Sequence, residues 1–462
     1  MSAQPTTPAA IVLAAGQGTR MRSRIPKVLH TLAGRAMIDH VLDALAGAGV
    51  TRPVVVIGHE ADAVEAALGG RAITARQVPQ RGTADAVRKG LAVLPDETGI
   101  ILVTMGDAPL QPSELFTALL RQQTEADTVL TLVSAFVDDP SGYGRIVRAA
   151  DGRATAIVED RDADEETRRL REVNVGTYAF DVAWLREAIA RVGESASGEF
   201  YMTELVALAV ADDRGVGVLL ADVAAEAMGI NDRVVLAAAE ERMHRRIAET
   251  HMRNGVTIVD PGTTRIDAGV EIGQDARIEP WTILEGATVI AQDAVIGPHA
   301  HLRDARIGPR TRVWASVVEE STVAEDVHVG PFAHVRPGSE VGPRCRIGNF
   351  AEIKNSRLGA GTQQHHFSYL GDAEIGSNVN IGAGSVTANF DGVAKHRTVI
   401  GDGAKIGVDT MMVAPIHIGE GSTTGAGSVV TRDVAPGAKV VGVPARPIKI
   451  RKEVGSPPPD GR

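Results

Sequence analysis

The most constraining feature of this sequence is a six-residue repeat that runs through most of its second half. Aliphatic residues recur at every sixth position in three stretches. They are Ile272, Ile278, Leu284, Ile290, Ile296 and Leu302, then Val323, Val329, Val335, Val341, Ile347 and Ile353, then Ile400, Ile406, Met412 and Ile418. A chain coiled into a prism needs one inward apolar residue per face. The repeat therefore predicts a left-handed parallel β-helix of hexapeptide repeats.

Glycine often follows the aliphatic residue, as in Ile296-Gly297, Val329-Gly330 and Ile406-Gly407. A prism needs a tight corner at this point, and glycine suits such corners because it tolerates a positive φ. The chain has 50 glycines among its 462 residues, whereas aromatic residues make up only 3%. This composition agrees with many tight turns.

The register of the repeat breaks at two places. One break covers residues 361–370 and carries His365, His366 and Tyr369, and the other covers residues 388–398 and contains Asn389 and Phe390. An irregular segment in a regular solenoid is typical of a binding loop.

Before residue 253, short apolar runs alternate with helical patterns. Residues 10–14, 53–57 and 100–103 are apolar runs, whereas residues 37–45, 61–68 and 83–94 have helical spacing. This alternation is typical of βαβ units and predicts a Rossmann-like α/β domain with a mostly parallel sheet. We expect this α/β domain over residues 1–231, a connecting helix over 232–252, the β-helix over 253–454 and a disordered tail over 455–462.

Composition narrows the classes of function. The net charge is −10 and no long basic stretch occurs, which argues against a nucleic-acid partner. The single cysteine, Cys345, excludes an internal disulfide and a cysteine-cluster metal site, and it is compatible with a reducing cytosol. We see neither a signal peptide nor an apolar run long enough to cross a bilayer. We therefore expect a cytoplasmic protein that does not bind membranes.

A glycine-rich loop follows the first apolar run. Gly16 and Gly18 let the backbone approach a phosphate, and Arg20 and Lys27 supply positive charge for a triphosphate. The loop alone is also compatible with NAD binding, but the added Arg and Lys favour nucleotidyl transfer. Asp107 ends a buried run, where a carboxylate commonly holds a ligand or Mg²⁺, although a turn-forming role is the plain alternative.

These motifs carry a family resemblance over residues 9–450. The stretches LAAGQGTRM and PKVLHTLAG, together with Gly142-Tyr143-Gly144-Arg145 and Gly229-Ile230-Asn231, resemble the bacterial bifunctional N-acetylglucosamine-1-phosphate uridyltransferases/glucosamine-1-phosphate acetyltransferases. Such enzymes make UDP-N-acetylglucosamine from glucosamine-1-phosphate, acetyl-CoA and UTP. The resemblance implies Mg²⁺ as cofactor, acetyl-CoA and UTP as co-substrates, and a homotrimer whose acetyltransferase sites are shared between neighbouring chains.

The resemblance also implies roles for residues of the first domain. Asp107 and Asn231 would ligate Mg²⁺, while Arg20 and Lys27 would contact phosphates and carry catalysis by neutralising charge. The uridine nucleotide and N-acetylglucosamine would be held by Leu13, Ala14, Ala15, Gly16, Lys27, Gln77, Gly82, Thr83, Met105, Gly106, Asp107, Gly144, Glu159, Asn174 and Asn231. The family often has an aromatic residue at the position of Met105.

In the second domain, acetyl transfer to an amine needs a base, because the amine loses a proton as it attacks the thioester. A lone loop histidine is usually only solvated. The segment that begins at His366, however, resembles the family's catalytic segment and implies that His366 is the base. Glucosamine-1-phosphate would be bound by Arg336, Lys354, Tyr369 and Asn380, and acetyl-CoA by Ala383, Asn389, Phe390, Val408 and Ala426, with Lys395 nearby.

The chain departs from the family mainly in the acetyl-CoA half. The family commonly has Tyr at the position of Phe390, Ser at the position of Val408 and a basic residue near Gly442.

Two alternatives stand beside the bifunctional enzyme. One is a monofunctional sugar-1-phosphate nucleotidyltransferase whose β-helix is structural or regulatory, as in glucose-1-phosphate adenylyltransferases. The other is a non-catalytic scaffold that trimerises through its solenoid.

Overall fold

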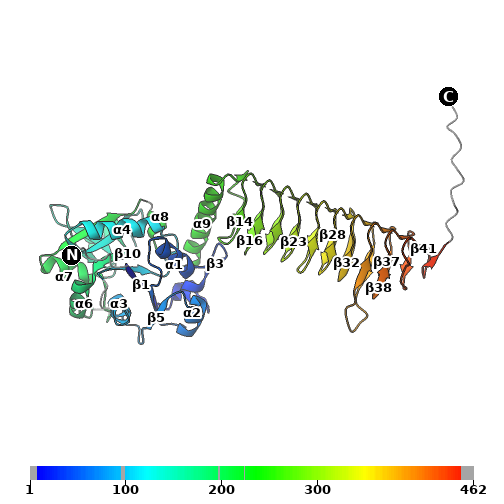
Figure 1. Cartoon of the computed structure of the whole chain (residues 1–462). Helices are drawn as coiled ribbons and strands as arrows, with labels where there is room; N and C mark the ends of the chain where they lie inside the picture. Colours follow the sequence, from blue (N-terminus) through cyan, green and yellow to red (C-terminus); the bar gives the residue numbers. More distant parts are fainter. Residues whose placement is uncertain (1–7, 95–98, 196–197, 223, 449–462) are drawn as a thin grey trace, which may run out of the picture. The chain divides into compact units, whose positions relative to one another are not determined.

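The computed structural model describes residues 8–94, 99–195, 198–222 and 224–448, which divide into two compact units at Met243 and His244 (Figure 1). The division falls inside helix α9 (Arg233–Arg253), close to the bounds expected for a connecting helix. Asp232 caps this helix, because its Oδ1 accepts from the N–H groups of Val234 and Val235 at 2.9 Å. Residues 1–5 and the tail expected over 455–462 lie outside the described residues.

The first unit is built on a sheet whose strands run in the order β11–β7–β10–β6–β1–β4–β5. These strands are β1 (Ala9–Ala14), β4 (Val54–Ile57), β5 (Ile73–Arg76), β6 (Ile100–Met105), β7 (Thr128–Phe136), β10 (Glu172–Asp181) and β11 (Gly215–Leu220). The four strands from β6 to β5 are parallel, whereas β10 runs antiparallel to β6 and β7. The predicted mostly parallel sheet is confirmed. A hairpin of β8 (Arg145–Arg148) and β9 (Ala154–Val158) extends from β10.

Helices cover both faces of this sheet, because alternate residues of a strand point to opposite sides. Ala10 and Val12 pack into one core with α1 (Met37–Gly47), α2 (Ala61–Leu68) and α4 (Ser113–Glu125). Ile11 and Leu13 pack into the other core with α3 (Thr83–Leu91), α6 (Val182–Ala188) and α7 (Glu204–Ala211). The strand β1 is thus buried on both sides, and its carboxyl end opens towards the glycine-rich loop.

The second unit is a parallel β-helix of three sheets with strands of two to four residues. The sheets start at β12 (Thr257–Ile258), β13 (Arg265–Ile266) and β14 (Glu271–Ile272). Strands of successive coils pair in parallel, so inward side chains stack in columns such as Ile278, Ile296 and Val313. Every repeat position predicted from the sequence packs in this one core, which confirms the β-helix.

The register break predicted over residues 361–370 is wrong. Strands β30 (Gln363–Gln364) and β31 (Ser368–Gly371) continue two of the sheets without interruption. Gln364 takes the inward position between Leu358 and Leu370 and is fully buried. Its Nε2 donates to Ser368 Oγ at 2.8 Å, and this hydrogen bond offsets the burial of the amide nitrogen where an aliphatic residue was expected.

The second predicted break is confirmed. Between β34 (Val386–Ala388) and β35 (Thr398–Ile400) the chain leaves the prism as the projecting loop seen near β38 (Ile416–Ile418) in Figure 1. Phe390 and Lys395 form an isolated antiparallel bridge within it. Asp391 orders its tip, because its carboxylate accepts from the N–H groups of Val393 at 2.8 Å and Ala394 at 2.7 Å.

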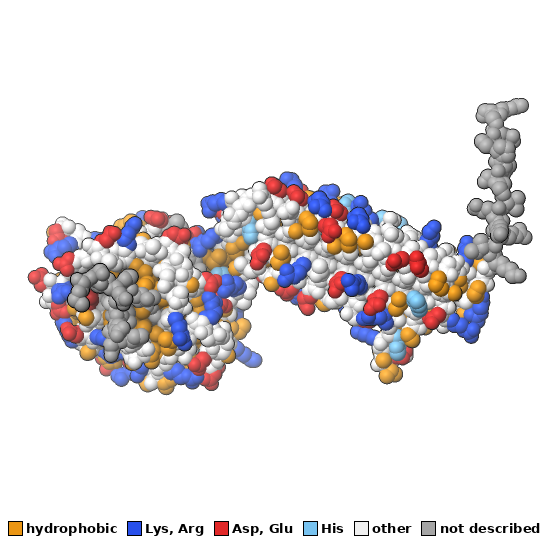
Figure 2. All heavy atoms as spheres, viewed as in Figure 1, with side chains coloured by type: hydrophobic (Ala, Val, Ile, Leu, Met, Phe, Trp, Pro, Cys, Tyr) orange, Lys and Arg blue, Asp and Glu red, His pale blue; other side chains and the backbone are white. Residues whose placement is uncertain are grey.

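Basic and acidic side chains are interspersed over the face of each unit that Figure 2 draws. Among the described residues, no helix is both long and apolar enough to cross a membrane.

Candidate active sites

The glycine-rich loop and Asp107 meet because β1 and β6 are parallel neighbours in the sheet. Carboxyl ends of parallel strands lie at the same edge, so the residues that follow β1 and β6 are brought together. The N–H of Gly106 donates to the carbonyl of Leu13 at 2.9 Å and fixes this contact. Gly18 has φ +61°, and a Cβ there would lie 2.7 Å from Lys27 Cβ. Glycine is therefore needed for the loop to close over Lys27.

Two cations and two oxygen ligands converge at this edge. Lys27 Nζ forms an ion pair with Asp107 Oδ2 and donates to Asn231 Oδ1 at 2.8 Å. Arg20 donates to the same Asn231 oxygen at 2.8 Å. The Asp107 and Asn231 oxygens thus surround one positive charge, although the two residues lie far apart in the sequence. One carboxylate and one amide oxygen fit Mg²⁺, which binds few protein ligands and completes its shell with water and substrate phosphates.

Two adjoining cavities share this cluster. One, of about 280 Å³, is lined by Leu13, Ala14, Gly16, Gly18, Thr19, Arg20, Lys27, Val28, Met105, Asp107 and Asn231. The other, of about 270 Å³, shares Arg20, Met105, Asp107 and Asn231 with it and adds Thr83, Gly144, Glu159 and Asn174 among others. Asp107 therefore lies where two ligands would meet. Of the residues predicted for this site, Ala15, Gln77, Gly82 and Gly106 lie outside the lining of these two cavities.

The second cavity is lined by polar groups, among them the Glu159 carboxyl group. Glu159 Oε1 accepts from Thr203 Oγ1 at 2.9 Å, and burial raises the pKa of Glu159 above its usual range. A Cβ on Gly144 would lie 2.8 Å from Ile157, so a side chain there would clash with Ile157, and it would lie in contact with both Glu159 oxygens at 3.6 Å. Thr203 and the buried Tyr178 line this cavity and were missed by the sequence analysis, because neither has a distinctive sequence pattern.

Gly82 and Thr83 lie at the start of α3, and Gln77 directly follows β5. Gln77 is buried, and its Nε2 donates to the Gly82 carbonyl and to Asp85, both at 2.9 Å. Gly82 has φ +104°, and a Cβ there would lie 2.5 Å from the Phe200 carbonyl oxygen. Thr83 Oγ1 accepts from the N–H of Met202 at 2.9 Å. These contacts join α3 to residues 200–202, of which Tyr201 and Met202 line the second cavity.

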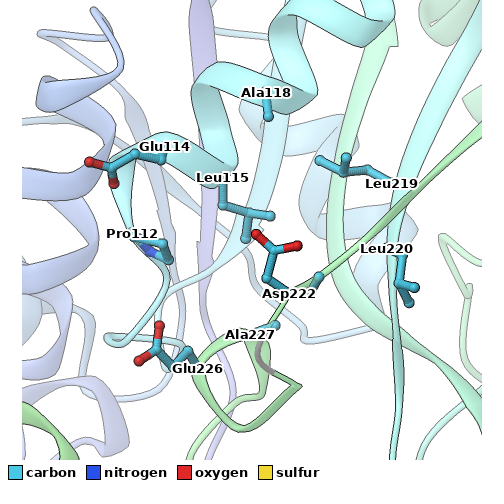
Figure 3. Close-up of a pocket in the computed structure, with 10 residues that line it drawn as sticks. Pro112, Glu114, Leu115, Ala118, Leu219, Leu220, Asp222, Glu226 and Ala227 are labelled. Carbon is cyan, nitrogen blue, oxygen red and sulfur yellow. The ribbon is translucent and has the colours of Figure 1, made fainter.

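A further cavity of about 390 Å³ lies between α4 and the end of β11, with Leu115 and Asp222 facing each other across it (Figure 3). None of the residues predicted for a site lines it.

On the β-helix, three predicted residues share one sheet face in successive coils. Arg336 directly follows β25 (His334–Val335), Lys354 ends β28 (Ala351–Lys354), and Tyr369 lies on β31 opposite Glu352. Arg336 donates to Glu352 Oε1 at 2.6 Å. The nearby Lys395 ammonium, together with desolvation, lowers the pKa of Lys354. This cluster of cations fits an anionic ligand.

His366 lies at the exposed corner between β30 and β31, next to the exposed His365, with 6.5 Å between the two ring centroids. His365 Nε2 is 3.2 Å from Gln363 Oε1. The two rings thus lie on one exposed corner of the β-helix.

The remaining predicted residues lie on other parts of the prism. Asn380 is on β33 (Asn380–Ile381), in the 12-stranded sheet, which is a different face from that of Tyr369. Ala383, Val408 and Ala426 stack at one corner of consecutive coils, where the N–H of Asp409 donates to the Ala383 carbonyl at 2.7 Å. Asn389 is buried at the base of the projecting loop, and Phe390 is exposed on it. A single chain therefore does not gather all of these residues on one face.

One prediction concerns the corner that carries the two histidines. The His365 carbonyl packs on Gly348, where a Cβ would lie 1.9 Å from its oxygen. We expect Gly348→Ala to displace this corner, to cost about 1–3 kcal/mol of stability, and to reduce CoA release more than pyrophosphate release. The matched control is Gly262→Ala in the first coil, whose Cβ would meet only Asp260 at 3.3 Å. Thermal melts and both assays measure the outcome, and equal behaviour of the two variants would contradict it.

Comparisons with known proteins agree with the division of the chain into an α/β unit and a β-helix. Residues 10–174 match the MobA-like NTP transferase domain, and residues 320–355 and 397–432 match the bacterial transferase hexapeptide family of six repeats. The chain is 45% identical to "Bifunctional protein GlmU" of Geobacillus thermodenitrificans (strain NG80-2), covering 94% of this chain and 95% of that protein. It is 47% identical to the protein of the same name from Thermobifida fusca (strain YX), covering 97% and 96%. With this similarity over nearly its whole length, the chain belongs to the family of bifunctional GlmU proteins.

Proposed function

We propose that this chain makes UDP-N-acetylglucosamine in two steps, one in each unit. The β-helix transfers an acetyl group from acetyl-CoA to glucosamine-1-phosphate. The α/β unit then transfers uridylate from UTP to N-acetylglucosamine-1-phosphate and releases pyrophosphate. The observation that carries this proposal is the convergence of Arg20, Lys27, Asp107 and Asn231 between two adjoining cavities. Membership of the bifunctional family supports assigning both activities to one chain.

In the uridylyl step, the sugar phosphate attacks the α-phosphorus of UTP in line, and pyrophosphate leaves. The nucleophile is already an anion, so no general base is required. Mg²⁺ held by Asp107 and Asn231 would neutralise charge on the phosphates. Lys27 and Arg20 would add positive charge next to the same groups, while Glu159 and Asn174 would orient the sugar in the second cavity. Met105 borders both cavities, at the junction between the two substrates.

In the acetyl step, the amine nitrogen of glucosamine-1-phosphate attacks the thioester carbon, the C–S bond breaks, and CoA leaves. His366 would accept the proton that the amine loses. Arg336 and Lys354 would hold the phosphate, since both lie on one face of the sheet that carries Tyr369. Asn389, with Phe390 beside it, and the corner of Ala383, Val408 and Ala426 would hold acetyl-CoA.

We propose a homotrimer as the working form. Asn380 lies on a different face of the prism from Tyr369 in one chain, and a neighbouring β-helix could bring such faces together. UTP and acetyl-CoA are available in the cytosol, which supports a cytoplasmic location.

Expression of the two units as separate fragments tests the division of labour. We expect residues 1–252 to release pyrophosphate as a monomer, because that fragment contains the whole cavity pair and its two cores. We expect residues 232–462 to release CoA only as an oligomer, with activity that falls on dilution. Sedimentation and the two assays measure these outcomes. A monomeric C-terminal fragment with full activity would contradict the shared site, and absence of CoA release from the intact chain would favour the monofunctional alternative.

A further inference from the structure

A buried carboxylate at a corner of the β-helix joins the two halves of the proposed acetyltransferase site. Five residues with positive φ stack at this corner: Asp304, Glu320, Gly338, Asn355 and Asp372. Each of them donates its backbone N–H to a carbonyl oxygen one coil earlier. The N–H of Asp372, for example, donates to the Lys354 carbonyl at 3.0 Å. Of these five, Asp372 alone is buried, with 8% of its surface exposed.

Both oxygens of Asp372 are bonded by side chains of the adjacent coils. Asn355 Nδ2 of the preceding coil donates to Oδ1 at 2.6 Å, and Asn389 Nδ2 at the base of the projecting loop donates to Oδ2. Lys354 Nζ lies 4.0 Å from Oδ2. The carboxylate thus links Lys354, proposed to bind the sugar phosphate, with Asn389, proposed to bind acetyl-CoA.

The charge of Asp372 suits this position. Burial favours its neutral form, but hydrogen bonds from Asn355 and Asn389 and the charges of Lys354 and Lys395 outweigh burial, so the pKa of Asp372 lies below its usual value. The two ammonium groups repel one another, as the lowered pKa of Lys354 indicates. A single carboxylate beside them keeps Lys354 oriented before an anionic ligand binds.

We infer that Asp372 is a positioning residue of the acetyl-transfer site. It holds Asn389 and Lys354 in place, so that acetyl-CoA and the phosphate of the amino sugar are bound at the correct positions relative to each other. The inference rests on the proposed acetyltransferase function. Asp372 does not touch the reacting atoms; it acts through its two partners.

The hydrogen-bond pattern gives a specific test. In Asp372→Asn one acceptor oxygen of the carboxylate becomes a donor nitrogen, so with Asn355 and Asn389 in their present orientations one of their two hydrogen bonds is lost. We expect the KM values for acetyl-CoA and for glucosamine-1-phosphate to rise together, and kcat/KM for CoA release to fall about 10²-fold, as for an ångström-scale misplacement. In the double variant Asp372→Asn/Asn355→Asp a carboxylate at 355 accepts from the new amide, and both hydrogen bonds can form again. We expect it to regain most of the lost kcat/KM.

The matched control is Asp304→Asn, which has the same corner conformation in a distant coil and should keep wild-type kinetics. Unchanged KM values in Asp372→Asn, or loss of kcat alone without rescue by the double variant, would overturn the inference. Should Asp372→Asn fail to fold, Asn355→Ala removes one partner, and wild-type KM values in that variant would also overturn it. A different result would contradict the proposed function itself, namely that the wild-type chain releases no CoA from these substrates.

Discussion

Asp107→Asn is expected to abolish most uridylyl transfer while leaving acetyl transfer intact. The substitution keeps the shape of the side chain but removes the negative charge that faces Lys27 and would face Mg²⁺. The Asp107 side chain is 14% exposed, so water replaces little of the lost interaction. We expect kcat/KM for pyrophosphate release to fall about 10³-fold, because a metal ion supplies several kcal/mol of charge stabilisation and about 1.4 kcal/mol is a factor of ten.

Pyrophosphate release should be measured over a range of Mg²⁺ concentrations, with CoA release followed in the same preparation. Asp62→Asn is the matched control, because Asp62 is an exposed aspartate of the same unit that pairs with Arg76. It should behave as the wild type. Near-normal uridylyl transfer by Asp107→Asn at low Mg²⁺ would remove Asp107 from the metal site.

His366→Ala should have the complementary effect. Removal of a general base typically costs about 10²- to 10⁴-fold in rate, so CoA release should drop by that factor while pyrophosphate release persists. His365→Ala is the matched control on the same corner, where the His365 ring lies beside Gln363. It should cost little. The reverse pattern, measured as CoA release at saturating acetyl-CoA, would exchange the roles of the two histidines.

Much of the fold could be predicted because both units carry periodic patterns. The six-residue spacing identified the inward column of the β-helix, and each predicted position lies in its core. Gln364 broke the aliphatic pattern without breaking the coil, and Ser368 accepts a hydrogen bond from its buried amide nitrogen. Sequence spacing reports apolar burial, so it cannot distinguish such a polar core residue from an irregular loop.

The first site could be predicted only in part. The position of Asp107 at the end of a buried strand could be seen in the sequence, since strand ends follow from the apolar runs. Its pairing with Lys27 depends on β1 and β6 being neighbours, although β4 and β5 lie between them in the sequence. Thr203 and Asp372 could not be singled out, because their roles depend on contacts with Glu159 and Asn389 that form only in the folded chain.

The central claim is that one chain performs both steps, one after the other. A single reaction of the intact protein with glucosamine-1-phosphate, acetyl-CoA, UTP and Mg²⁺ tests this claim most directly. CoA and pyrophosphate should be followed together. We expect immediate release of CoA, a lag before pyrophosphate appears, and loss of both signals when acetyl-CoA is omitted. Rapid pyrophosphate release from glucosamine-1-phosphate without acetyl-CoA, or pyrophosphate release with no CoA formed, would contradict it.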